Sequence, residues 1–163
     1  TNAMRTSSSS AVFLRKTEER NRFWLNLTNT NGLFSQMLVG YMPEATSGYD
    51  NAIDGRYIND APTALTSLIN GEEYTIQGRA LPFNSSDVVP LNFKTDIAGN
   101  YTIAIDHVDG FFSTGQPIYL KDNLFIQFSK ETNQTKKKNL LLEIFKIYCG
   151  KKEKLLIVCL SLF

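Results

Sequence analysis

The sequence predicts an all-β fold, an antiparallel β-sandwich that is incomplete at its carboxy-terminal side. Two observations favour it over a helical fold. Apolar and polar residues alternate with a period of two between residues 22 and 122, and Gly, Pro, Asn and Asp recur between the alternating runs. No run in this region has the 3.6-residue period of a helix. The 163 residues suit about one domain.

Residues 1–19 are predicted to form a linker. Four consecutive serines occupy positions 7–10, and the segment lacks the basic start and the apolar run of a signal peptide. We therefore expect this chain to be a fragment of a longer protein, with its globular part beginning near residue 20.

The first strand is predicted at residues 22–29. Phe23, Leu25 and Leu27 fall on one face of this strand and Trp24 on the other, as in a half-buried strand. Residues 33–41 are apolar on both faces, which is typical of a central strand. Residues 101–106 repeat the alternation and predict a later strand.

A hairpin is predicted at Asn70-Gly71. The pair lies between two strand-like runs, at residues 65–69 and 73–80. Asn and Gly both tolerate the positive φ angles of a type I′ turn, so a two-residue connection is expected here.

The charge of the chain is unevenly distributed. Residues 125–163 hold eight Lys and three Glu, a balance of +5, whereas the other 124 residues hold nine basic and 13 acidic side chains, a balance of −4. An acidic globular part does not attract phosphate backbones, so nucleic-acid binding is disfavoured. No run of about 18 apolar residues occurs, so no transmembrane segment is expected.

The chain resembles the β-rich region that precedes the carboxy-terminal sorting signal of surface proteins exported by type IX secretion in gliding Bacteroidetes. The similarity covers residues 20–124. It is carried by Trp24-Leu25-Asn26-Leu27-Thr28, the strand at 36–41, Gly48-Tyr49-Asp50, Asp54-Gly55, the run at 76–83, Val89-Pro90-Leu91 and residues 105–110.

This resemblance implies export across the outer membrane by the secretion machinery and attachment at the cell surface, or release, as part of an adhesin or a polysaccharide-degrading enzyme. The resemblance implies no catalytic residue in this chain, and His107 stands where the family has glutamine. We therefore expect a non-catalytic, extracellular stem module without its sorting signal. A sandwich of this kind would hold its ends far apart and resist unfolding. The alternative is a carbohydrate-binding or adhesion module.

Residues 125–163 form a divergent tail in which the resemblance stops. The tail is dominated by residues with A- and T-rich codons and contains both cysteines, Cys149 and Cys159. We hypothesise that it is translated out of frame, with a divergent native extension as the alternative. A short helix is expected at residues 140–148, and a loosely attached tail would leave a sheet edge open.

Three aspartates suggest a calcium site. Asp50, Asp54 and Asp60 lie in one loop, where their oxygens could hold Ca²⁺. Their spacing is not that of an EF-hand, and Asp residues beside glycines commonly form turns by bonding their own backbone. No other cofactor is expected.

Exposed aromatic side chains are candidates for stacking on a polysaccharide. Trp24, Tyr49 and Tyr57 are the predicted ligand residues, and Tyr41 and Tyr101 are further aromatic candidates. Filling the core is the competing role for each ring.

Acid–base chemistry is a third possibility. Asp106, His107 and Asp109 could form a carboxylate pair with a proton carrier. The competing reading places His107 at the surface and Asp109 in a turn. Separately, Arg79 is predicted to form a structural ion pair with Asp87 or Asp96.

Overall fold

The computed structural model describes residues 20–59, 61–122, 144–149 and 152–159. These residues contain no α-helix, and no helix among them is long and apolar enough to cross a membrane. The all-β prediction is therefore confirmed. The elements are β1 (Asn21–Asn29), β2 (Phe34–Met42), β3 (Gly55–Arg56), β4 (Thr63–Ile69), β5 (Glu72–Ala80), β6 (Val88–Thr95), β7 (Gly99–Val108), the 3-10 helix η1 (Gly110–Thr114), β8 (Tyr119–Asp122), β9 (Ile144–Cys149) and β10 (Lys152–Cys159).

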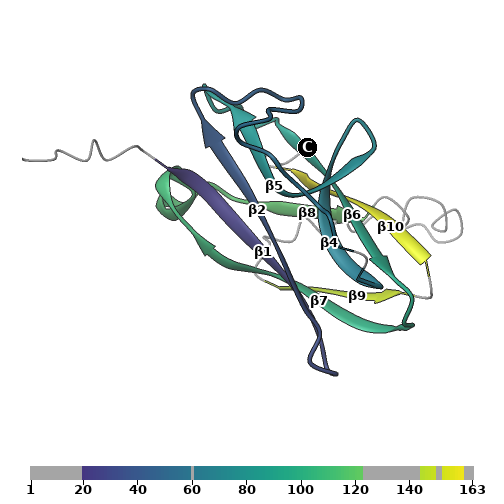
Figure 1. Ribbon diagram of the computed structural model, residues 1–163. Helices are drawn as coiled ribbons and strands as arrows, with labels where there is room; N and C mark the ends of the chain where they lie inside the picture. Colours follow the sequence, from purple (N-terminus) through teal and green to yellow (C-terminus); the bar gives the residue numbers. More distant parts are fainter. Residues whose placement is uncertain (1–19, 60, 123–143, 150–151, 160–163) are drawn as a thin grey trace, which may run out of the picture.

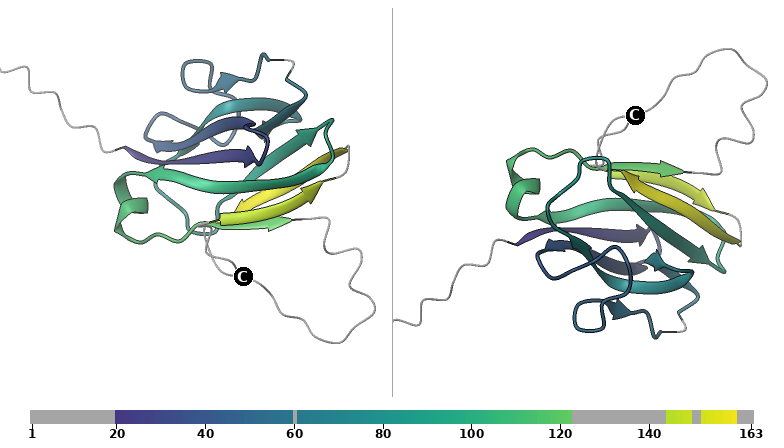
Figure 2. Two further views of the ribbon diagram at one scale, coloured as in Figure 1. Left: turned by 90° about the horizontal axis from the view of Figure 1, so that it is seen from below. Right: turned by 90° about the horizontal axis from the view of Figure 1, so that it is seen from above.

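The strands form one curled sheet rather than two separate sheets (Figures 1 and 2). Their order is β8-β10-β6-β4-β5-β2-β1-β7-β9, with β3 beside β5. The sheet is also mixed, because β2 and β5 run parallel. Both features depart from the predicted antiparallel sandwich. The cause is β5, which pairs with β4 over its first residues, as in Ser67 with Tyr74, and with β2 over its last residues, as in Met42 with Ala80.

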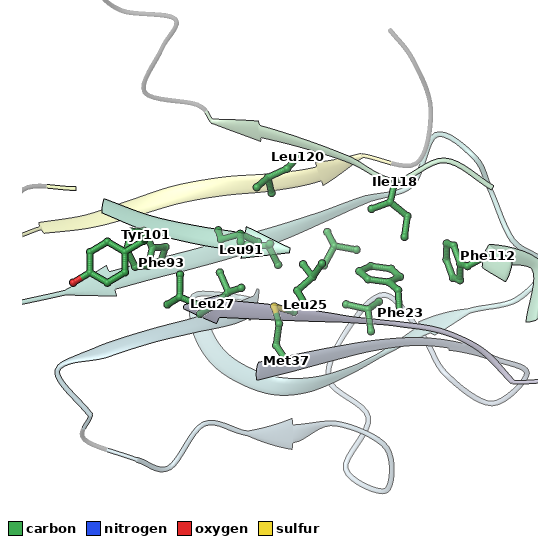
Figure 3. Close-up of a cluster of buried hydrophobic side chains, with 14 of the residues drawn as sticks. Phe23, Leu25, Leu27, Met37, Leu91, Phe93, Tyr101, Phe112, Ile118 and Leu120 are labelled. Atoms are coloured by element: carbon green, nitrogen blue, oxygen red, sulfur yellow. The ribbon is translucent and has the colours of Figure 1, made fainter. Parts of the chain in front are cut away.

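The curled sheet encloses a core between facing strands (Figure 3). Phe23, Leu25 and Leu27 of β1 are fully buried, as their alternation predicts. They face Leu91 and Phe93 of β6 across the core, and together with their neighbours these side chains supply the apolar burial that stabilises the fold. The buried cluster comprises Phe23, Leu25, Leu27, Met37, Val39, Tyr41, Leu65, Val89, Leu91, Phe93, Tyr101, Ile103, Phe112, Ile118 and Leu120.

Two further local predictions are confirmed. Asn70 and Gly71 connect β4 and β5 with φ angles of 54° and 86°, as a type I′ turn requires. Strand β2 lies between β1 and β5, which fits its apolar character on both faces.

The carboxy-terminal segment departs from its prediction. Residues 144–149 form β9, so the helix expected over 140–148 is wrong for this part. Strand β9 pairs with β7, and β10 pairs with both β6 and β8, so the edges of β6 and β7 are covered rather than open. The apolar and β-branched run at 155–158 explains why a strand is favoured in β10. The origin of the tail by a frame shift stays a hypothesis.

The start of β1 and the end of β10 lie at the same end of the molecule. Asn21 pairs with Tyr41, and the Tyr41 hydroxyl donates to Asp87 at 2.8 Å. The residue after Asp87, Val88, pairs with Cys159. The expectation that the fold holds its ends far apart is therefore wrong. The reason is the curl of the sheet, which brings β6 across from β1.

Two ion pairs reinforce this end. The Arg22 side chain donates from Nε to Asp109 Oδ2 at 2.9 Å, and the backbone amides of these two residues each donate to the other residue. Arg79 pairs with Asp87, so the structural ion pair expected for Arg79 is confirmed, with Asp87 as its partner. Both arginines donate more than one hydrogen bond, and charge-assisted pairs of this kind are stronger than single neutral bonds.

Candidate functional site

A β-bulge in β7 lies opposite Trp24. Phe23 pairs with Val108 and Leu25 pairs with Ile105, so only Trp24 separates the two pairs on β1. On β7 two residues, Asp106 and His107, occupy the same interval. A bulge directs side chains that would otherwise alternate, and here both Asp106 and His107 are solvent-exposed.

The Asp106 carboxylate is the centre of a polar cluster on the outer face of β1, β2 and β7. Asn26 Nδ2 donates to Asp106 Oδ1 at 3.0 Å, and Gln36 Nε2 donates to Asn26 Oδ1 at 2.8 Å and to Asp106 Oδ2 at 3.3 Å. His107 Nδ1 lies 2.7 Å from Asp106 Oδ2. Hydrogen bonds from His107 and the two amides lower the pKa of Asp106, so its carboxylate stays ionised.

The Trp24 ring is stacked on the His107 ring. The ring centroids are 3.7 Å apart and the planes differ by 18°. The Arg22 guanidinium carbon lies 4.6 Å from the Trp24 ring centroid, while Arg22 itself is held by Asp109. Trp24 thus faces outward as predicted, and it is partly covered by side chains of its own and the neighbouring strand rather than fully open.

The two predicted tyrosine ligands lie elsewhere. Tyr49 is 42% exposed, its ring packs on Tyr74 at 5.6 Å, and the Arg56 guanidinium lies over it at 5.3 Å. Tyr57 lies beneath Lys94, whose Nζ is 4.6 Å from the ring centroid. The structure therefore does not gather the three predicted aromatic residues into one cluster.

The predicted calcium loop is organised by hydrogen bonds. Asp50 Oδ2 accepts from the Thr46 amide at 2.6 Å, and Asp54 accepts from the amides of Asp50 and Gly78 at 2.6 and 2.7 Å. Both carboxylates thus do what turn-forming residues do. In the described ranges no three His, Cys, Asp or Glu residues come together as metal ligands. Asp60 lies outside these ranges, so calcium binding here stays a prediction.

The remaining candidates are structural. Tyr41 and Tyr101 are buried in the core. Burial and the Asp87 carboxylate raise the pKa of Tyr41, so its hydroxyl keeps its proton and donates to Asp87. Asp109 binds Arg22 and precedes η1 rather than forming a hairpin turn, and its carboxylate is therefore not paired with that of Asp106. The acid–base alternative requires the carboxylates of Asp106 and Asp109 to act together, and the cluster around Asp106 does not include Asp109.

Two residues of the polar cluster were not predicted from the sequence. In the sequence, Asn26 and Gln36 look like ordinary outward-facing residues of the strands that form β1 and β2. Their register, which pairs Asn26 with Gln36, brings the two amides together. The only sequence signal was the alternation that turns both side chains away from the core.

Comparison with known proteins gives a family but no activity. A family model described as a domain of unknown function, DUF8693, matches residues 1–134, and the chain belongs to this family. The matched region includes the whole polar cluster and ends before β9. No curated protein and no solved structure matches the chain.

Proposed function

We propose that this chain is a non-catalytic, load-bearing stem module of an extracellular surface protein exported by type IX secretion. The export route rests on the sequence resemblance. The mechanical role is supported by one observation of the fold: the strands nearest the two ends of the described chain both lie inside the sheet. β1 is hydrogen-bonded to β2 and β7, and β10 to β6 and β8.

An interior strand resists extraction better than an edge strand. Force on β1 acts on two ladders at once, because eight residues pair with β2 and six with β7. The Arg22–Asp109 pair adds a side-chain link at the point where β1 begins. Because both terminal strands reach the same end of the molecule, the module would hold the segments it joins close together rather than act as a long spacer.

Single-molecule force spectroscopy tests the mechanical role. The 163-residue chain, placed between marker domains of known strength, should unfold in one event at a force above that of a helical marker. Arg22→Gln should lower this force because it removes the link to Asp109. Arg56→Gln is the matched control, since the Arg56–Glu72 pair is 3.7 Å long and exposed. The mechanical role would be rejected if the chain unfolded at a lower force than the helical marker, or if the two variants unfolded at equal forces.

The location is tested separately in the native host. Antibodies raised against residues 20–122 should label intact cells or the medium. Labelling that requires lysis would contradict an extracellular position, whatever the mechanical result.

A further inference from the structure

The bulge in β7 gives the outer face of the sheet a set of groups that the core does not need. Asp106 and His107 are both exposed, and neither packs into the buried cluster. A regular strand would place only one of them on this face. Bulges interrupt the backbone ladder and are enriched beside functional sites, where they direct a side chain.

The polar cluster offers both kinds of hydrogen-bonding partner that a sugar hydroxyl needs. The Asp106 carboxylate accepts, while the Asn26 and Gln36 amides each combine donors with an acceptor. Their mutual bonds fix the positions of these groups before any ligand arrives. Preorganised polar groups lose less conformational entropy on binding.

The stacked rings lie directly beside this cluster. His107 is 56% exposed at its side chain and links the two parts, because its ring stacks on Trp24 while its Nδ1 contacts Asp106. The exposed ring of His107, backed by Trp24 and next to fixed donors and acceptors, suits a sugar, which has C–H groups on one face and hydroxyls at its rim.

The charge of the face favours a neutral ligand. Asp106 is its exposed carboxylate, and the positive charge of Arg22 is compensated by Asp109. An acidic polymer would meet the Asp106 carboxylate without an unpaired arginine to offset it.

We propose that the outer face of β1, β2 and β7 is a binding site for a neutral polysaccharide, with Asp106, Asn26 and Gln36 bonding hydroxyls of one sugar unit and the His107–Trp24 stack packing against its ring. The inference is independent of the load-bearing role. It replaces the predicted set of Trp24, Tyr49 and Tyr57 by a cluster that retains only Trp24.

Affinity electrophoresis of the full chain in gels containing neutral glucans, mannans or xylans, with a polyuronate as the acidic comparison, tests the site. At least one neutral polymer should retard the protein, and the polyuronate should not. Asp106→Ala and Gln36→Ala should each weaken retardation by about tenfold, as expected for loss of a hydrogen bond to a polar ligand. Tyr49→Ala is the control, because Tyr49 is an exposed aromatic residue outside the cluster.

A second readout reports on the site directly. Trp24 is the only tryptophan of the chain, so its fluorescence should change with added polymer and saturate with the retardation. Thermal melting of each variant shows whether it is folded. The proposal is overturned if no neutral polymer binds, if the polyuronate binds more tightly, if folded Asp106→Ala and Gln36→Ala variants bind as wild type does, or if only Tyr49→Ala abolishes binding.

Discussion

Asp87 joins three elements through one carboxylate. It accepts hydrogen bonds from Arg79 Nε at 2.9 Å, from the Tyr41 hydroxyl at 2.8 Å and from the Val88 amide at 2.9 Å. The side chains of Arg79 and Asp87 are only 9% and 20% exposed. The identity of this pair could be predicted from sequence, but the part played by Tyr41 could not, since it depends on β2 and β5 running side by side in parallel.

Asp87→Asn should destabilise the protein by about 3 kcal/mol, because it leaves the Arg79 guanidinium largely buried without its counter-charge. Urea unfolding measures the change. Glu72→Gln is the control: it removes an exposed carboxylate paired with Arg56 at 3.7 Å and should change the free energy of unfolding by less than about 0.5 kcal/mol. Equal effects of the two substitutions would show that the Asp87 cluster is not a stabilising centre.

The same substitution should change the response to acid. Burial raises the pKa of Asp87, but hydrogen bonds from Arg79 and Tyr41 outweigh it and hold the pKa below the ordinary value of an aspartate. A carboxyl with a lowered pKa stabilises the folded state above its unfolded pKa, and this contribution is lost as the pH falls through the folded value. Below about pH 4 the wild type should therefore lose stability more steeply than Asp87→Asn.

At the scale of elements, strands that depend on local pattern could be predicted and those that depend on distant pairing could not. The alternation in β1 and the Asn70-Gly71 turn are properties of neighbouring residues. The parallel pairing of β2 with β5 joins segments separated by other strands, so no local signal identifies it. The bulge at Asp106 and His107 arises from the register of β7 against β1, which the alternation of β7 alone does not reveal.

The loop that carries Asp50 and Asp54 is held against β5 by close contact at Gly78. A Cβ atom at Gly78 would lie 2.5 Å from Ile53 Cγ2 and 3.1 Å from Ala45 Cβ. Gly78→Ala should therefore push the loop off β5 and cost about 1–3 kcal/mol, as overpacking does. Gly48→Ala, whose Cβ would meet its nearest neighbour at 3.6 Å, is the matched control. Urea denaturation of both variants checks the difference, and equal stabilities would contradict this account of the loop.

At the scale of the whole molecule, the curl of the sheet is completed by strands from the carboxy-terminal segment. Strand β10 pairs with eight residues of β6 and joins β8 to the rest of the sheet, while β9 covers β7. Ile118, just before β8, and Leu120, within β8, are buried in the core. The sequence analysis expected residues 125–163 to be loosely attached, because composition does not show that two runs of this segment pair in register with β6, β7 and β8.

A chain ending after Asp122 should lose its cooperative unfolding. Removal of β10 separates β8 from the sheet, exposes Ile118 and Leu120, and leaves β6 and β7 with unpaired backbone groups at new edges. Domains are stable by only about 5–15 kcal/mol, so the loss of two strands should lower the melting temperature sharply and promote association through the open edges. Melting curves and light scattering measure both effects, and deletion of residues 160–163 alone, which spares β10, should leave them unchanged. If the shortened chain stays monomeric and melts as cooperatively as the full chain, β9 and β10 are not needed by the fold, and the tail is an addition to a domain already complete.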